Sequence, residues 1–409
     1  MKAKWMIGIG LLSVACLLLT GCWDSRELRT MSIVTAMGVD KAPNKNEYRI
    51  SLQIVNPGTV ATGLAGGGGG GANVTPVTIY TNTGSTVMEA IRNLSQKAPR
   101  ELFFSHTQLL IIGEPLARQG INELFEMFDR SHEARLSTRV LVTRGVTAET
   151  VVQTLAPLEK IPANSVAGKI KNTSKVWSEN TEVIMDDVIK ALASEGREPM
   201  INGIRIVGEP KEGNKLSNNE QTDPPAVIEI KSMALFKDGK LSYWLSVHEG
   251  RGIAWIQNKM KSTIINIDCK DKKEAVGIEV VRSKTDIKAE VRAGRPTFHI
   301  VIREEGDVSE VKCPIDLSKG EEITKLEKEW AKKTKKEVMQ AMNAAQRAKS
   351  DVFGFGEAVN RANPRAWESM KKDWNETFAD SKVDVKVEAF IRRTGMRTKP
   401  FLMEQGVQE

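Results

Sequence analysis

The first 21 residues constrain this chain more than any other part of it. Met1 to Lys4 carry two lysines and no acid, and residues 5–19 are uncharged. Fifteen helical residues span about 22 Å, which is short of the roughly 30 Å hydrocarbon core of a bilayer. A basic start, a short apolar stretch and small residues before a cleavage point are typical of a secretory signal peptide. The sequence therefore predicts a signal peptide at 1–21 and a mature protein that works outside the cytoplasm.

The residues at the end of this stretch indicate a lipid anchor. Leu19-Thr20-Gly21-Cys22 resembles the bacterial lipobox, in which a diacylglycerol is attached to the cysteine and cleavage leaves that cysteine first. We predict lipidation at Cys22 and a lipidated tether over 22–30. The alternatives are an ordinary signal peptide with an incidental cysteine, or a short membrane anchor. Cys16 is a weaker match, because cleavage there would shorten the apolar segment.

The composition is that of a folded protein. Of 409 residues, 40% are hydrophobic and 27% charged, which excludes wholesale disorder and a polytopic membrane protein. The length predicts two or three domains. A net charge of +7 is small for this length, and aromatic residues make up only 5%, so nucleic-acid binding gains little support.

Strands alternate with helices over 31–199, which predicts an N-terminal mixed α/β domain. Residues 47–55 alternate apolar and polar side chains as a half-buried strand does. Thr86 and Glu89 form a capping-box pair that predicts the start of a helix. The six glycines at 66–71 predict a flexible loop tip, and the run lacks the Gly-Lys-Ser/Thr ending of a phosphate-binding loop.

The remaining chain predicts two further units. Residues 200–262 contain two strand-like runs around Asp238-Gly239, a strong hairpin signal, and predict a small middle domain. Residues 263–395 predict an α+β domain with a final strand over 383–387. Its other elements are four successive antiparallel strands and a long helix, at 263–269, 276–281, 287–291, 297–303 and 319–349. The predicted fold class is therefore α+β or mixed α/β, a three-domain lipoprotein with a C-terminal antiparallel sheet packed by long helices.

No pattern in the sequence indicates catalysis or a cofactor. The Gly-x-Ser-x-Gly elbow, the Cys-x-x-Cys pair and the zinc-protease helix are all missing. We therefore predict no enzyme, no metal, no cofactor and no chemically essential histidine. The chain's four histidines are scattered along it, at His106, His132, His248 and His299.

Two cysteines besides Cys22 remain after cleavage. Cys269 and Cys313 both lie in the region of the predicted C-terminal sheet. In an exported protein they could form one disulfide, or they could be two buried thiols. Spacing alone does not decide between these alternatives, because it does not give the distance between the two Cα atoms.

Several motifs together resemble the Ger(x)C family, the lipoprotein C subunits of spore germinant receptors. The most specific begins at the predicted lipidation site, where Cys22 is followed by Trp-Asp-Ser-Arg-Glu-Leu. A strand ending Gly38-Val39-Asp40 comes next. Weaker matches extend the resemblance over nearly the whole mature chain, at 104–106, 109–114, 135–143 and 353–357.

The resemblance implies a three-domain, mixed α/β lipoprotein on the outer face of the spore inner membrane. It implies partner A and B membrane subunits, a role in nutrient-triggered germination through protein contacts, and no enzymatic activity. Only Cys22 carries over as a functional residue. The germinant, any direct contact with it, the partner-binding surface and the stoichiometry stay open. The alternative function is a lipid-anchored solute-binding protein of a transport system, which usually has two doubly wound α/β lobes.

Overall fold

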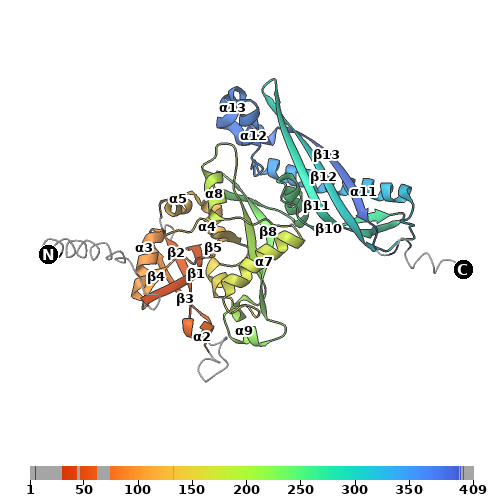
Figure 1. The fold of residues 1–409 in the computed structure, drawn as a ribbon. Helices are drawn as coiled ribbons and strands as arrows, with labels where there is room; N and C mark the ends of the chain where they lie inside the picture. Colours follow the sequence, from red (N-terminus) through yellow and green to blue (C-terminus); the bar gives the residue numbers. More distant parts are fainter. Residues whose placement is uncertain are drawn as a thin grey trace.

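The computed structural model describes residues 30–43, 47–61, 74–131 and 133–395, together with Trp5, Arg397 and Lys399. The predictions on the signal peptide, Cys22, the glycine run at 66–71 and His132 lie outside the described residues. The described chain forms a larger N-terminal part built on one sheet and an elongated C-terminal part built on another (Figure 1).

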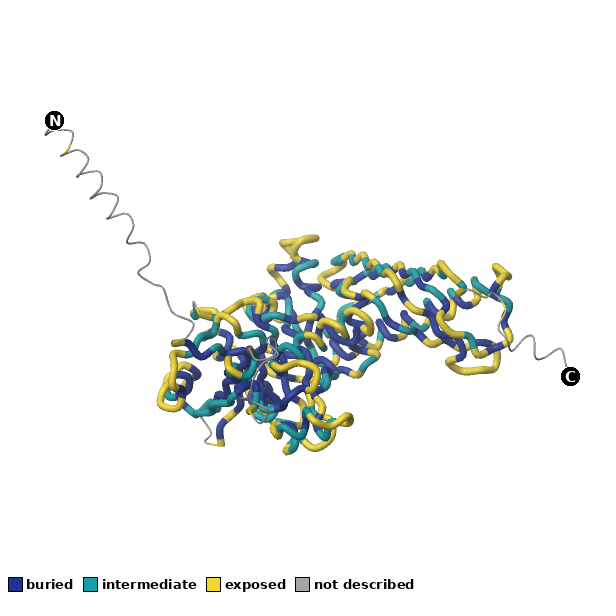
Figure 2. Tube along the Cα trace, turned by 60° about the horizontal axis from the view of Figure 1, so that its bottom comes forward, coloured by how far each residue is buried: buried dark blue, intermediate teal, exposed yellow. Residues whose placement is uncertain are grey.

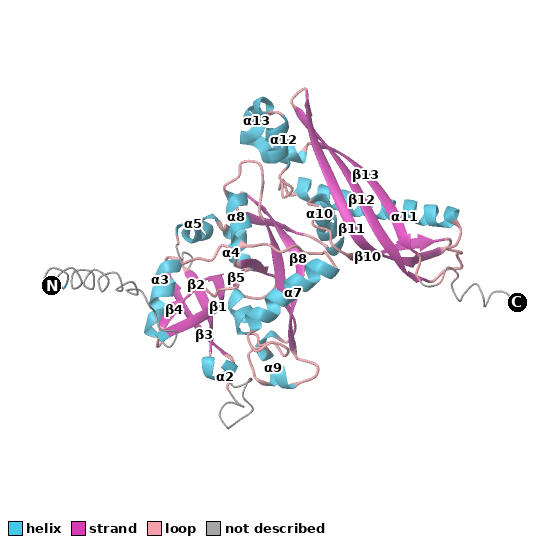
Figure 3. Cartoon of the chain, in the orientation of Figure 1, coloured by secondary structure: helices cyan, strands magenta, loops and turns pink. Residues whose placement is uncertain are grey.

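The N-terminal part is a nine-stranded mixed sheet (Figure 3). β1 pairs in parallel with β4 and β5, and the parallel pairing continues through β6 to β7. The other neighbours are antiparallel. β4 pairs with the start of β1, off the main path. In spatial order the rest are β3 (Val77–Gly84), β2 (Tyr48–Val55), β1 (Met31–Lys41), β5 (Leu109–Ile112), β6 (Arg139–Thr143), β7 (Met200–Gly208), β8 (Ala226–Lys237) and β9 (Lys240–Trp244), and β4 spans Glu101–Phe103.

Helices cover both faces of this sheet. Successive residues of a strand point to opposite faces, so Leu109 and Ile111 join one buried cluster while Leu110 and Ile112 join the other. This explains why β5 is apolar throughout, as a strand buried on both faces must be. One face carries α3 (Val87–Asn93), α4 (Glu114–Gln119), α5 (Asn122–Arg130) and α8 (Met185–Leu192), and the other carries α6 (Ala148–Gln153) and α7 (Pro162–Val176). The short helices α2 (Pro57–Ala61) and α9 (Ser217–Glu220) lie at one end of the sheet (Figure 1).

The predicted hairpin at Asp238-Gly239 is confirmed. Both residues have positive φ, 52° and 73°, which is the backbone that a two-residue turn between β8 and β9 requires. Strands β7 to β9, from the segment 200–262, hydrogen-bond into the sheet that begins at β1. The boundary expected near residue 199 therefore falls within one sheet, and the boundary near 262 falls between two.

The C-terminal sheet has four strands, in the order β10 (Thr263–Cys269), β11 (Lys272–Arg292), β12 (Arg295–Val311) and β13 (Lys382–Arg393). The first three are antiparallel, and β13 joins β12 in parallel. The long helix α11 (Gly320–Arg347) confirms the one predicted over 319–349 and packs on this sheet (Figure 3). The predicted fold class, mixed α and β with a largely antiparallel C-terminal sheet, is confirmed.

One detail of the predicted C-terminal strands is wrong. Strands 276–281 and 287–291 are a single 21-residue strand, β11, without a turn between them. The polar residues at 282–286 predict a turn, but each of them has a register partner on β12. The Asp286 carboxylate also forms an ion pair with Arg303 Nη1 at 2.8 Å. The alternation of apolar and polar residues is interrupted there because the strand bulges between Val280 and Arg282 and both of its faces become more exposed.

The two parts meet at α10 (Val247–Ile256) and at a cluster of short helices after α11. Every residue of α10 from Glu249 to Ile256 is buried. Buried segments run from the larger part into the elongated one (Figure 2), and one apolar cluster contains side chains from both sheets. The short helices are α12 (Phe355–Ala362), α13 (Pro364–Met370) and α14 (Trp374–Ala379). Among the described residues, no helix is long and apolar enough to cross a membrane.

Candidate functional site

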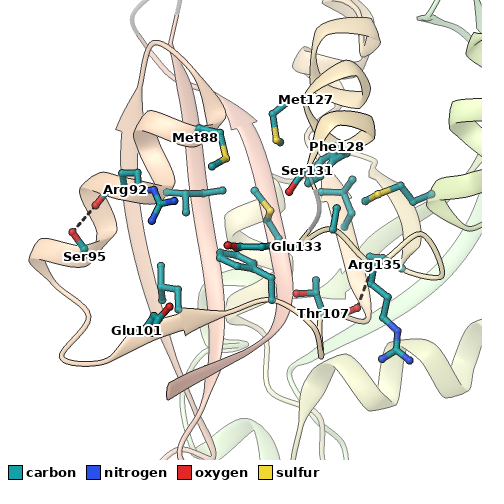
Figure 4. Close-up of a pocket in the computed structure, with 18 of the residues that line it drawn as sticks. Met88, Arg92, Ser95, Glu101, Thr107, Met127, Phe128, Ser131, Glu133 and Arg135 are labelled. Carbon is teal, nitrogen blue, oxygen red and sulfur yellow. Dashed lines mark hydrogen bonds between the residues drawn. The ribbon is translucent and has the colours of Figure 1, made fainter. Parts of the chain in front are cut away.

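The candidate site is an apolar pocket of about 160 Å³ between α3, α5 and the start of the sheet (Figure 4). Its interior is made of methionine, leucine, isoleucine and phenylalanine side chains, and charged and hydroxyl groups surround them. The apolar set is Met37, Met88, Ile91, Leu102, Phe104, Leu110, Met127, Phe128, Ala134 and Met185.

An interruption in the sheet creates the floor of this pocket. β1 pairs with β4 over Met31–Ile33 and with β5 over Ala36–Val39. Between β4 and β5 the chain leaves β1 in a turn, closed by a hydrogen bond from the Thr107 N–H to the Phe104 carbonyl at 2.8 Å. Phe104 and Thr107 consequently line the pocket.

Two helices form its walls. The Thr86 hydroxyl accepts the Glu89 N–H at 3.1 Å and fixes the start of α3, which confirms the predicted helix start and places Met88 on the pocket. From α5, Met127 faces Met88 across the opening (Figure 4). Met37 and Met185 are almost fully buried. Unbranched thioether side chains repack readily, so these walls can adapt to what enters.

Charged side chains surround the opening. Arg92 and Arg100 are exposed, and neither forms an ion pair within the described part of the chain. Arg135 points away from the cavity (Figure 4), and its Nη1 donates to the Ser105 carbonyl at 3.1 Å. The Thr138 hydroxyl donates to the Thr107 carbonyl at 3.0 Å. The motifs 104–106 and 135–143, distant in sequence, therefore meet at this opening.

The apolar lining of the pocket suits the binding of an apolar group. None of the described histidines lines it, and it contains no paired nucleophile and base. Elsewhere, His106 is exposed at the turn after β4, and His299 lies on the C-terminal sheet within 4 Å of Glu290 and Asp384. The described residues contain no group of three or more His, Cys, Asp or Glu side chains able to hold a metal.

A buried charged cluster lies where the two parts meet, and sequence reasoning missed it. The Arg251 Nε donates to Glu337 Oε2 at 3.1 Å, and its Nη1 donates to the Ile264 carbonyl at 3.1 Å. His248 Nδ1 lies 2.9 Å from Glu337 Oε1. Glu304 is fully buried nearby, and burial raises its pKa to about 8.

A signal for Glu304 was present in the sequence. It has the same strand parity as Phe298, Ile300 and Ile302, which all point inward. A lone acid continuing an inward apolar series indicates a buried carboxyl group.

The motif at 353–357 ties the two parts together. Asp351, just before it, is fully buried and accepts hydrogen bonds from the N–H groups of Phe353 and Gly356 and from Trp374 Nε1, at 2.9–3.1 Å. Its carbonyl accepts the Glu198 N–H at 2.8 Å. Burial raises the pKa of the Asp351 carboxyl to about 6, against the lowering effect of these donors. This motif is structural.

Comparisons with known proteins agree over the whole length. Two family models match: "Spore germination protein N-terminal domain" over 24–206 and "Spore germination B3/ GerAC like, C-terminal" over 231–395. Spore germination protein KC of Bacillus subtilis (strain 168) is 36% identical over 403 residues, covering 98% of both chains. Spore germination protein YndF of the same organism is 26% identical, covering 97% of this chain and 99% of its own.

A solved structure shares the fold. The crystal structure of the GerBC protein matches with a TM-score of 0.54 at 20% identity, covering 90% of this chain and all of that one. The two family models and the 36% identity to spore germination protein KC confirm the resemblance drawn from the motifs. The chain belongs to the Ger(x)C, or GerAC-like, family of spore germination proteins.

Proposed function

We propose that this protein is the lipid-anchored subunit of a nutrient germinant receptor, needed for spore germination through protein–protein contacts at the membrane. The observation that carries the proposal is the 36% identity to spore germination protein KC over 98% of both chains. The two family models, which between them span most of the mature chain, support the same conclusion.

Lipid attachment at Cys22 supplies the membrane anchor in this proposal. A diacylglycerol thioether brings two acyl chains, and each buried methylene contributes about 0.8 kcal/mol, so two chains hold a protein where one does so only marginally. The partners are the membrane-embedded A and B subunits of the receptor, and the location is the outer face of the spore inner membrane.

The protein acts in this proposal without catalysis. The names of its relatives describe germination and no reaction. The solute-binding alternative is not favoured, because the chain ends in an antiparallel-rich sheet with a long helix instead of a second doubly wound lobe.

The test separates anchoring from folding. A version secreted with a non-lipoprotein signal and starting at Trp23 lacks the anchor, and the wild-type chain is its control. We expect the anchorless version to fold, as judged by circular dichroism, to stay in the soluble fraction and to fail to support germination at normal expression. The cause would be its lost effective concentration near its partners. Full germination with the protein only in the soluble fraction would refute the proposal.

A further inference from the structure

We infer that the pocket between α3 and α5 is a docking site for one apolar side chain of a membrane-embedded partner protein, on a segment that also carries an acidic residue. The inference rests on the proposed function, because the position of the pocket relative to the membrane follows from lipidation at Cys22.

The start of the described chain places the pocket near the membrane. Met31, the first residue of β1, follows Cys22 by nine positions. Nine extended residues reach at most about 30 Å. The pocket adjoins Met31 directly, since Met31–Ile33 pair with Glu101–Phe103 and Glu101 and Leu102 line the pocket. A partner that protrudes about this far from the bilayer can therefore reach it.

The size of the pocket fits a single side chain. Its volume of about 160 Å³ matches the cavity of roughly 150 Å³ that takes up one benzene molecule in an engineered protein core. A leucine, methionine or phenylalanine side chain has this size, whereas a full phospholipid acyl chain is much longer. The four methionines allow the walls to close on any of these side chains.

The surroundings fit a protein segment better than a free small molecule. Met88, which lines the pocket, is 39% exposed. A small molecule deep inside the pocket would leave part of Met88 exposed, but a protein segment over the opening covers it. Methionine and arginine, which are enriched in protein interfaces, are prominent around this pocket.

The charges at the opening indicate the character of the partner segment. Glu101 and Glu133 also line the pocket, but Arg92 and Arg100 are exposed and have no ion-pair partner in the described residues. An aspartate or glutamate close to the inserted side chain would complement them and speed the encounter. The partner segment therefore combines one apolar anchor with at least one acid.

Photo-cross-linking in intact spore membranes tests this directly. A benzophenone amino acid replaces Met88 in one variant and Val207 in the control. Val207 is 47% exposed on β7, three strands away from β1. We expect the probe at position 88, but not the probe at position 207, to label a membrane-embedded protein. The labelled residue of that protein should be apolar and lie within a few positions of an aspartate or glutamate. Labelling only of lipid or small molecules, or equal labelling from position 207, would overturn the inference.

A charge substitution provides a second measurement. Met88→Glu, compared with Val207→Glu, is expected to lower the amount of that protein co-purifying from detergent about tenfold, which corresponds to about 1.4 kcal/mol. Circular dichroism and thermal unfolding verify that both variants fold. If Met88→Glu does not fold, the cross-linking with the benzophenone probe at position 88 remains the test. Undiminished co-purification would overturn the docking site. The proposed function would still stand, because it is tested separately, by whether the version without the Cys22 lipid supports germination.

Discussion

Three ionisable side chains, Arg251, Glu304 and Glu337, are buried where the two parts of the molecule meet. Arg251 and Glu337 compensate each other through charge-assisted hydrogen bonds. Glu304 has no such partner, and neither of its carboxyl oxygens accepts a hydrogen bond from a described residue. Its surroundings are Thr334 and Trp255, with the Glu337 carboxylate as a further influence that raises its pKa. Glu304 is therefore held neutral at moderate pH.

Replacing Glu304 should change how stability depends on pH. The folded pKa of about 8 exceeds the ordinary value of 4.5, so the folded state binds the extra proton. The Glu304 carboxyl makes its full contribution to the free energy of unfolding below about pH 4.5. This contribution falls by about 1.4 kcal/mol per pH unit as the pH rises to 8. Glu304→Gln should remove this loss, with a growing advantage over wild type between pH 5 and 8 in urea unfolding.

Glu310→Gln controls for the removal of one negative charge, since Glu310 is exposed on the same strand. If Glu304→Gln and wild type show parallel pH profiles across this range, Glu304 is not held neutral in the folded protein.

The disulfide between Cys269 and Cys313 resolves the choice between a bridge and two thiols that the sequence left open. Their Cα atoms are 6.3 Å apart, within the range that a disulfide spans. It closes a loop of 44 residues around β11 and β12. Loop-closure entropy for that length corresponds to about 4 kcal/mol.

We expect Cys269→Ala with Cys313→Ala to lower the free energy of unfolding by about 2–4 kcal/mol, measured by denaturant titration. A reducing agent should destabilise the wild-type protein similarly and leave the double variant unchanged. Equal stability of the oxidised wild type and the double variant would contradict a stabilising role.

At the scale of elements, α10 is the connection on which the arrangement of the two sheets depends. A Cβ added at Gly250 would lie 2.4 Å from the Glu179 carbonyl oxygen. One added at Gly252 would lie 2.3 Å from the Glu337 carbonyl oxygen and 2.6 Å from the Ala341 Cβ. Glycine at these two positions therefore lets α10 lie close to the backbone at Glu179 on one side and to the backbone of α11 on the other.

Two glycine substitutions in helices should have opposite effects. Gly252→Ala should lower the free energy of unfolding by about 1–3 kcal/mol, because α10 and α11 would have to separate. Gly168→Ala, in α7, meets no atom within 4 Å and should raise stability by about 0.5–1 kcal/mol through the better helix propensity of alanine. Thermal and denaturant unfolding of both variants measure the contrast. A Gly252→Ala variant as stable as Gly168→Ala would show that the α10–α11 contact yields without cost.

At the scale of the whole molecule, the division into three units near residues 199 and 262 stays a prediction. Strands pair with each other across the first boundary but not across the second. β7 pairs with β6 across the first, whereas the second separates β9 and α10 from β10, in the other sheet. We therefore expect 31–199 and 200–262 to unfold together, because separating them would expose the edge of β6.

Hydrogen exchange with mass spectrometry measures this. Peptides from β5 to β8 should show one common opening free energy under mildly denaturing conditions, and peptides from β11 and β12 supply the comparison. Earlier opening of 200–262 than of 31–199 would establish the middle segment as an independent unit.

The sequence alone determined the features that depend on neighbouring residues. The positive φ demanded by Asp238-Gly239, the helical period of 319–349 and the threonine cap at Thr86 are local, so each could be predicted and each is confirmed. The fold class followed from the order of such elements. The predicted lipid anchor at Cys22 likewise depends only on adjacent residues.

Only the tertiary structure decided the features that need partners distant in sequence. The continuous β11, the parallel docking of β13, the Cys269–Cys313 bridge and the meeting of 104–106 with 135–143 at the pocket are all of this kind. A strand continues through polar residues when another strand pairs with it, and two cysteines bond when the backbone brings them together. Those partners are fixed by the packing of the whole core, which the local sequence pattern does not contain.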